Sequence, residues 1–154
     1  MKLKMKLKTY RNYNQNISFL NDIYKNALMG RATIPSLLVI TKDVPFRVAL
    51  DTQLKEYQKI CTLTRKLLRN RNQSPTPLPM RARICSLTMT KLQTMFDSST
   101  SHIAEMMIQG NTMGVISITR NIKENKDCDK EIKKLAQKLL KTEQDNIEQM
   151  KAFL

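Results

Sequence analysis

The sequence contains few of the residues that sheet proteins depend on. It has three Gly, no Trp and an aromatic content of 5%, against ten Met and many Leu, Ile, Lys and Gln. Strands favour β-branched and aromatic runs, and the turns between them favour glycine. The composition therefore predicts an all-α protein, and 154 residues are enough for one domain with an ordinary core.

Cysteine is also scarce and is not arranged for cross-linking. Cys61, Cys85 and Cys128 are odd in number and widely spaced, which argues against a disulfide framework and against a zinc site. We expect reduced thiols and a cytoplasmic location. The chain also lacks an apolar run that could form a signal-peptide core or the roughly 20-residue span of a membrane helix, so neither export nor a membrane span is expected.

Acidic residues are half as frequent as basic ones. Asp and Glu number 13 and Lys and Arg 27, which gives a formal charge of +14 and raises the prospect of anionic partners such as nucleic acid. No acidic residue lies between Tyr57 and Phe96. The candidate anion-binding residues in that interval are Lys59, Arg65, Lys66, Arg69, Arg71, Arg81, Arg83 and Lys91. Interleaved aromatics for base stacking are missing, which disfavours a reader of single strands.

Residues 1–12 predict a basic, flexible tail ahead of a single helical domain at residues 13–154. Lys and apolar residues alternate from Lys2 to Lys8, a pattern that an edge strand or a membrane-contacting segment also has. The segment is short and its like charges repel, so a frayed tail is the preferred interpretation.

The rest of the chain has helical periodicity interrupted by turn signals. One helix is expected from Asn14 to about Gly30, with a kink or restart at Pro35. Asp43 and Pro45 indicate the start of a second helix of about 26 residues. The segment Arg69–Pro79 is predicted to be a loop. A third helix is expected to start near Pro79, and residues 80–125 are expected to form either one long helix or two helices. A final helix is expected from about Asp129 to the C-terminus. Short connections between such helices predict an antiparallel up-and-down bundle of four or five helices.

The segment HIAEMMIQGNTMG, residues 102–114, contains the only histidine. On a helix its apolar face is expected to hold Ile103, Met106, Met107, Gly110 and Gly114, with Asn111 inside the same arc. His102 and Glu105 fall on the polar side. An exposed His-x-x-Glu pair offers two ligands where a closed metal site needs three or four, so a metal role for His102 is not favoured.

The last helix carries two polar residues where apolar ones are expected. The seam of this helix, meaning the line of residues expected to face the core, advances in alternating steps of four and three residues. It consists of Ile132, Ala136, Leu139, Glu143, Asn146, Met150 and Phe153. Either the seam rotates locally and Glu143 reaches solvent, or the buried carboxyl is paired, hydrogen-bonded or neutralised.

Two motifs, MIQGNTMG from Met107 and LAQKLLKTEQDNIEQMKAFL from Leu135, carry a family resemblance. They resemble the bacterial ferritin-like family catalogued as domain of unknown function 305, some members of which are copper-associated. That family reads Met-Ile-x-His-His-x-x-Ala, then Leu-Ala, Gln-x-x-Glu-Ile-x-x-Met and Trp-Leu. Here Gly110 and Asn111 stand in place of the two histidines, Glu143 in place of the glutamine and Asn146 in place of the glutamate.

The resemblance implies a ferritin-like bundle whose metal site has lost its ligands, because glycine has no ligand atom and an amide binds copper or zinc poorly. The vestigial site would comprise Met107, Gly110, Asn111, Glu143, Asn146 and Met150, with no metal and no cofactor. No nucleophile–base pattern or Gly-rich phosphate loop indicates an enzyme.

We therefore expect a non-catalytic structural or protein-interaction module, with self-association or a protein partner. The alternatives are binding of nucleic acid or another anionic surface, and Cu(I) binding through Met106, Met107, Met113 and Met150.

Overall fold

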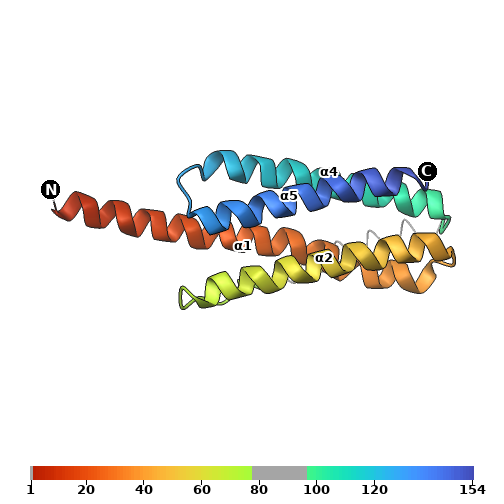
Figure 1. The fold of residues 1–154 in the computed structure, drawn as a ribbon, viewed down its shortest axis with the longest axis horizontal. Helices are drawn as coiled ribbons and strands as arrows, with labels where there is room; N and C mark the ends of the chain where they lie inside the picture. Colours follow the sequence, from red (N-terminus) through yellow and green to blue (C-terminus); the bar gives the residue numbers. More distant parts are fainter. Residues whose placement is uncertain (1, 78–96) are drawn as a thin grey trace.

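The computed structural model describes residues 2–77 and 97–154 of the chain (Figure 1). The described residues form four helices and no strand: α1 (Lys2–Ile40), α2 (Val44–Arg69), α4 (Thr100–Glu124) and α5 (Lys130–Lys151). The helices lie side by side in an elongated bundle (Figure 1). The all-α class is confirmed. None of the described helices is apolar and long enough to cross a membrane.

Helix α1 is longer at both ends than the sequence indicated. It begins at Lys2 and not at Asn14, and it continues through Gly30 and Pro35 to Ile40. Lys, Leu and Met are good helix formers, so the residues read as a tail have no intrinsic reason to break a helix. Pro35 is tolerated although it lacks an N–H, because Ile34 and Leu37 on either side of it are buried in the core.

The boundaries of α2 agree with the prediction. Asp43 is the N-cap, its carboxylate accepting a hydrogen bond from the Phe46 backbone N–H at 2.7 Å, and a proline occupies the first turn. The helix is 26 residues long. Residues 70–77 after it are not helical and are largely exposed, as the loop prediction requires; positions 78 and 79, and the helix expected from Pro79, lie outside the described residues.

A break in the chain precedes α4. Residues 97–99 are not helical, and Ser99 caps the helix by accepting a hydrogen bond from the His102 backbone N–H at 3.2 Å. One continuous helix over residues 80–125 is therefore excluded. Helix α4 ends within a few residues of the predicted position, and α5 begins and ends within a few residues of its predicted positions.

The helices pack mainly as two pairs, α1 with α2 and α4 with α5. Arg47 near the start of α2 donates to the Thr41 carbonyl at the end of α1, and Arg65 near the end of α2 donates to the Tyr24 hydroxyl. Helices α1 and α2 therefore run in opposite directions. Figure 1 shows that α4 and α5 do so too, whereas α2 and α4 point the same way.

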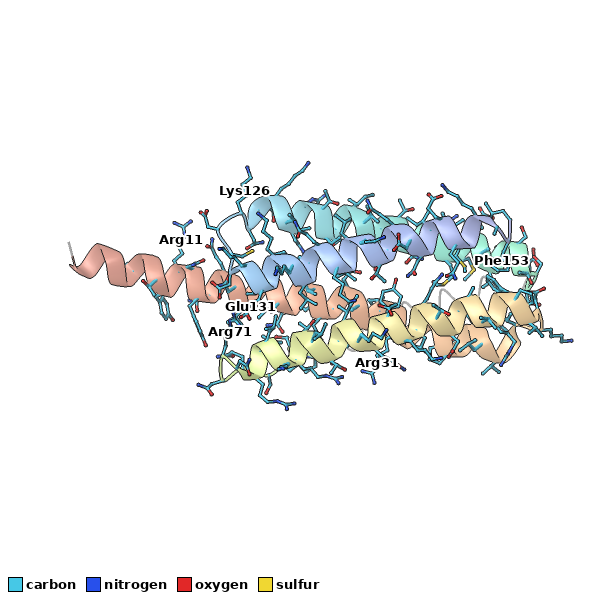
Figure 2. The ribbon with its side chains drawn as sticks, in the orientation of Figure 1. Arg11, Arg31, Arg71, Lys126, Glu131 and Phe153 are labelled. Atoms are coloured by element: carbon cyan, nitrogen blue, oxygen red, sulfur yellow. The ribbon has the colours of Figure 1, made fainter. Side chains whose placement is uncertain are left out.

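Polar contacts connect three segments of the chain at one end of the bundle. The Arg71 guanidinium lies 2.8 Å from an Asp129 carboxylate oxygen and 2.6 Å from one of Glu131 (Figure 2). The Tyr13 hydroxyl donates to the Arg71 carbonyl, and Asn16 accepts from the Asp129 N–H. These contacts join α1, the end of α2 and the start of α5.

Two of the three cysteines lie in the described part of the chain. Cys61 is buried in α2, Cys128 is half-buried in the turn before α5, and both are free thiols. Cys85 lies outside the described residues.

Candidate functional site

A cluster of four polar side chains is buried in the middle of the bundle. Tyr57 comes from α2, Asn111 from α4, and Glu143 and Asn146 from α5, and each is at most 5% exposed. The two residues that broke the apolar pattern of the last helix therefore face the core. The alternative in which Glu143 rotates to solvent is wrong.

The Tyr57 hydroxyl is the centre of the cluster. Its oxygen lies 2.7 Å from Asn111 Oδ1 and 2.9 Å from Glu143 Oε2, and it accepts from Asn146 Nδ2 at 3.2 Å. The Asn111 amide also donates to the Met107 carbonyl at 2.7 Å. A phenol has one proton and two acceptor sites. If that proton goes to Asn111, the contact with Glu143 is satisfied when the carboxyl is protonated and donates to the phenol oxygen.

Burial favours that protonation state. The pKa of Glu143 is raised from 4.5 to about 8, chiefly because burial disfavours the carboxylate, and the Tyr57 hydrogen bond opposes this only in part. The pKa of Tyr57 is raised well above 10, first by burial and then by the charge that Glu143 would carry when ionised. At neutral pH the cluster is therefore predominantly uncharged, which lowers the cost of placing it in the core.

Two glycines make room for the cluster. A Cβ on Gly114 of α4 would lie 2.8 Å from Glu143 Cδ, and a Cβ on Gly30 of α1 would overlap the Tyr57 ring. Both positions need the absence of a side chain and not any unusual backbone conformation. Gly114 lies on the buried face of α4, where the sequence placed it, and Gly30, which the sequence presented only as a helix end, brings α1 against the same tyrosine.

Gly110 does not belong to the site. It is exposed, and nothing lies within 4 Å of a Cβ built on it. The buried face of α4 follows Ile103, Met107, Asn111, Gly114 and Ile118 and includes Ala104. The face is thus rotated relative to the predicted one, and Gly110 falls at its edge while Asn111 takes the seam position. Histidines at residues 110 and 111 would consequently diverge in this chain.

The four methionines of the proposed Cu(I) site differ widely in solvent exposure. Met107 and Met150 are buried, Met106 is half-buried and Met113 is 72% exposed. In the described part of the chain no three His, Cys, Asp or Glu side chains gather closely enough to hold a metal ion. The cluster itself offers two amides, a phenol and one carboxyl that favours its proton, a donor set that fits neither copper nor zinc.

His102 differs from its prediction as an exposed residue. Its side chain is half-buried, and its Nε2 atom is buried without a hydrogen-bond partner among the described residues. The Glu105 carboxylate accepts instead from Gln109 Nε2 at 3.3 Å. The His-x-x-Glu spacing on α4 thus does not produce a pair.

The basic residues of α2 and of the loop after it are less available to an anion than their number indicates. Lys59 pairs with Glu56 at 2.5 Å, Arg65 binds the Tyr24 hydroxyl, and Arg71 is held by two carboxylates. Lys66 and Arg69 are exposed, with no ion pair to another described residue. Arg81, Arg83 and Lys91 lie outside the described residues.

An open groove of about 390 Å³ between α2 and α5 connects the cluster to the surface. Asn146 and Thr142 line it, and its rim carries the Lys138–Glu56 contact at 3.6 Å and the Lys141–Asp145 ion pair at 2.7 Å. The groove brings solvent to the edge of the cluster without exposing Glu143.

The sequence pointed to three of the four cluster residues but not to Tyr57. A signal was present, because Tyr57 places a hydroxyl on the apolar face of α2 beside Ile60 and Cys61, where a buried phenol needs a partner.

The chain was compared with protein-family profiles, with curated proteins and with solved structures, and none of them matches.

Proposed function

We propose that this chain is a non-catalytic, ferritin-like helical bundle that acts in the cytoplasm as a structural or protein-interaction module. The observation that supports this most directly is the Tyr57–Asn111–Glu143–Asn146 cluster. Its donors and acceptors satisfy one another and include no metal-binding imidazole or thiolate. In the resembled family, the positions of Asn111, Glu143 and Asn146 belong to the motifs around the metal site.

In this proposal the cluster is a polar lock that sets how the helices pair. A single buried polar contact can fix the register of packed helices at some cost in stability, because any other register leaves polar groups unpaired. Tyr57, Asn111 and Glu143 come from three different helices and meet at one phenol oxygen. A shift of any one helix by a turn would break the set.

The directions of the described helices are compatible with a ferritin-like bundle, in which neighbouring helices run antiparallel except across one long connection. Helices α2 and α4 point the same way, so the end of α2 and the start of α4 lie at opposite ends of the bundle (Figure 1). Ferritin-like folds have one pair of consecutive helices arranged in this way.

The structural role of the polar cluster is tested by removing the Tyr57 hydroxyl. The Tyr57→Phe variant removes the phenol oxygen that contacts Glu143 Oε2 and leaves Asn111 Oδ1 with the 3.4 Å hydrogen bond from Asn146 Nδ2, and we expect a loss of about 1–3 kcal/mol in the free energy of unfolding measured in urea. Tyr10→Phe removes an exposed hydroxyl and serves as the control. A Tyr57→Phe variant as stable as the parent would contradict a structural role.

The absence of a metal role is tested separately by depletion. Protein purified without a tag is dialysed against a chelator, and its thermal unfolding and metal content are compared before and after. We expect the same melting temperature and less than one metal ion per chain. A large drop in melting temperature on chelation, or stoichiometric copper, would overturn the proposal.

Binding of nucleic acid is a second candidate, supported by Lys66 and Arg69 at the end of α2, which are exposed and form no ion pair with a described residue. Such binding would depend on contacts between these basic side chains and the phosphates, so its affinity would fall steeply as the salt concentration is raised. A gel shift with duplex DNA at about 50 mM salt tests it, and the Lys66→Gln/Arg69→Gln variant should abolish the shift. The complete absence of a shift in the parent excludes this candidate.

A further inference from the structure

The first three turns of α1 extend beyond the rest of the bundle. Figure 1 shows that this part of the helix has no other described helix beside it, and Arg11, labelled in Figure 2, lies on it. The bundle begins at Tyr13, whose hydroxyl donates to the Arg71 carbonyl at 2.7 Å, and at Asn16, which is buried.

This projecting segment is strongly basic. Residues 2–21 include Lys2, Lys4, Lys6, Lys8 and Arg11 and no acidic residue; the first carboxylate is Asp22. Lys2 and Lys6, and likewise Lys4 and Lys8, are spaced four apart, where like charges destabilise a helix. A short helix without tertiary packing is marginal in water. A negatively charged surface would supply the missing stabilisation by neutralising the lysines.

The segment also exposes apolar side chains. Leu7 is 62% exposed and Tyr10 67%, and their spacing of three residues places them on one side of the helix. Tyr13 follows at 39%. Tyrosine is suited to a boundary between apolar and polar phases, because its ring is apolar and its hydroxyl is polar.

From this combination we propose that residues 2–13 bind the surface of an anionic lipid bilayer, lying in the headgroup region. Leu7 and Tyr10 would enter the interface, and the positive charge of the segment would attract the lipid phosphates. Each basic residue near such a surface adds to the attraction, and five lie within eleven residues. Duplex nucleic acid offers the same negative charge but no apolar phase for Leu7, so the bilayer fits the segment better.

Vesicle co-sedimentation tests the proposal with the full chain. We expect binding to phosphatidylcholine vesicles that contain about 30% phosphatidylserine, little binding to phosphatidylcholine alone, and release as salt is raised. The Leu7→Ser/Tyr10→Ser variant should bind at least about tenfold more weakly, since it removes the apolar contribution. Lys4→Gln/Lys8→Gln should also weaken binding.

A matched control exists at the other end of the bundle. Val44 and Val48 of α2 are 68% and 61% exposed, so Val44→Ser/Val48→Ser removes a similar apolar surface far from the segment. We expect this variant to bind vesicles like the parent. Equal loss in both double variants, or no binding by the parent, would overturn the proposal.

Competition separates the bilayer from nucleic acid. If the segment were a nucleic-acid arm, duplex DNA would bind the Leu7→Ser/Tyr10→Ser variant as tightly as it binds the parent, and it would displace the parent from vesicles at low concentration. That result would overturn the assignment to a bilayer. Helical circular dichroism that increases when anionic vesicles, but not neutral ones, are added would support it.

Discussion

Glu143 is a buried carboxyl whose protonation is coupled to folding. Its pKa is raised from 4.5 to about 8 in the folded protein, so between these values the folded state holds a proton that the unfolded state has released. The stability that this carboxyl contributes is therefore complete below about pH 4.5 and is lost as pH rises through 8. A displacement of this size corresponds to at most about 5 kcal/mol.

The Glu143→Gln variant should remove this pH dependence, because an amide keeps a donor toward Tyr57 and does not ionise. We expect the parent to lose free energy of unfolding relative to the variant between pH 5 and pH 9, measured by urea denaturation at each pH. Glu148→Gln is the control, since that carboxylate is exposed and pairs with Lys151 on the surface of the same helix. Parallel pH profiles for the parent and Glu143→Gln would show that Glu143 is ionised throughout.

Two glycines of α4 should respond oppositely to the same substitution. In Gly114→Ala the new Cβ meets the Glu143 carboxyl at 2.8 Å, and this side chain is held by burial and by Tyr57, so we expect a loss of about 1–3 kcal/mol. Gly110→Ala adds a methyl group at an exposed helix position with open space, and a gain of about 0.5–1 kcal/mol is expected. Thermal unfolding of both variants measures the difference in sign.

For single residues, the sequence was informative where a polar residue interrupted an apolar pattern. Glu143 and Asn146 stand out because the seam of α5 is otherwise apolar. Gly110 was misplaced because glycine carries no hydrophobic signal, so the pattern could not show that it lies at the edge of the buried face. Tyr57 was overlooked because a tyrosine counts as apolar in a helical pattern, although its hydroxyl organises the cluster.

Among the elements, α2 was predictable and α1 was not, and the reason is local. The start of α2 is determined by Asp43 and Pro45, whose cap chemistry acts within one turn. In α1, Gly30 and Pro35 oppose a helix locally, but distant contacts override them: the Tyr57 ring packs where a Gly30 side chain would be, and Ile34 and Leu37 are buried. Such contacts come from other helices, so the local sequence does not contain them.

The contribution of the Asp43 N-cap of α2 to stability can be measured. Asp43→Ala removes the carboxylate that accepts from the Phe46 N–H, and we expect a loss of about 1 kcal/mol in the free energy of unfolding. Asp51→Ala is the control, because it removes an exposed carboxylate that pairs with Lys55 on the surface of the same helix. If the two variants lose the same stability, the cap contributes no more than a surface charge.

For the whole molecule, the formal charge of +14 opposes the compact state. The Lys55–Asp51, Lys141–Asp145 and Lys151–Glu148 ion pairs are solvent-exposed and stabilise the fold only weakly. Lys66 and Arg69 add positive charge at the end of α2 without a paired carboxylate among the described residues. Repulsion among unpaired charges should therefore exceed the attraction of the surface pairs.

Salt should consequently stabilise this protein. Raising the salt concentration from about 10 mM to about 100 mM shortens the screening distance from about 30 Å to about 10 Å, which weakens long-range repulsion more than it weakens pairs in contact. We expect the melting temperature to rise with sodium chloride. Lys66→Gln should lessen that rise, because it removes a charge that has no ion-pair partner among the described residues. In Lys141→Gln the lost charge is paired with Asp145 at 2.7 Å, so its salt dependence should remain close to that of the parent. A melting temperature that falls with salt would mean that the ion pairs, and not the excess charge, dominate the electrostatics of the fold.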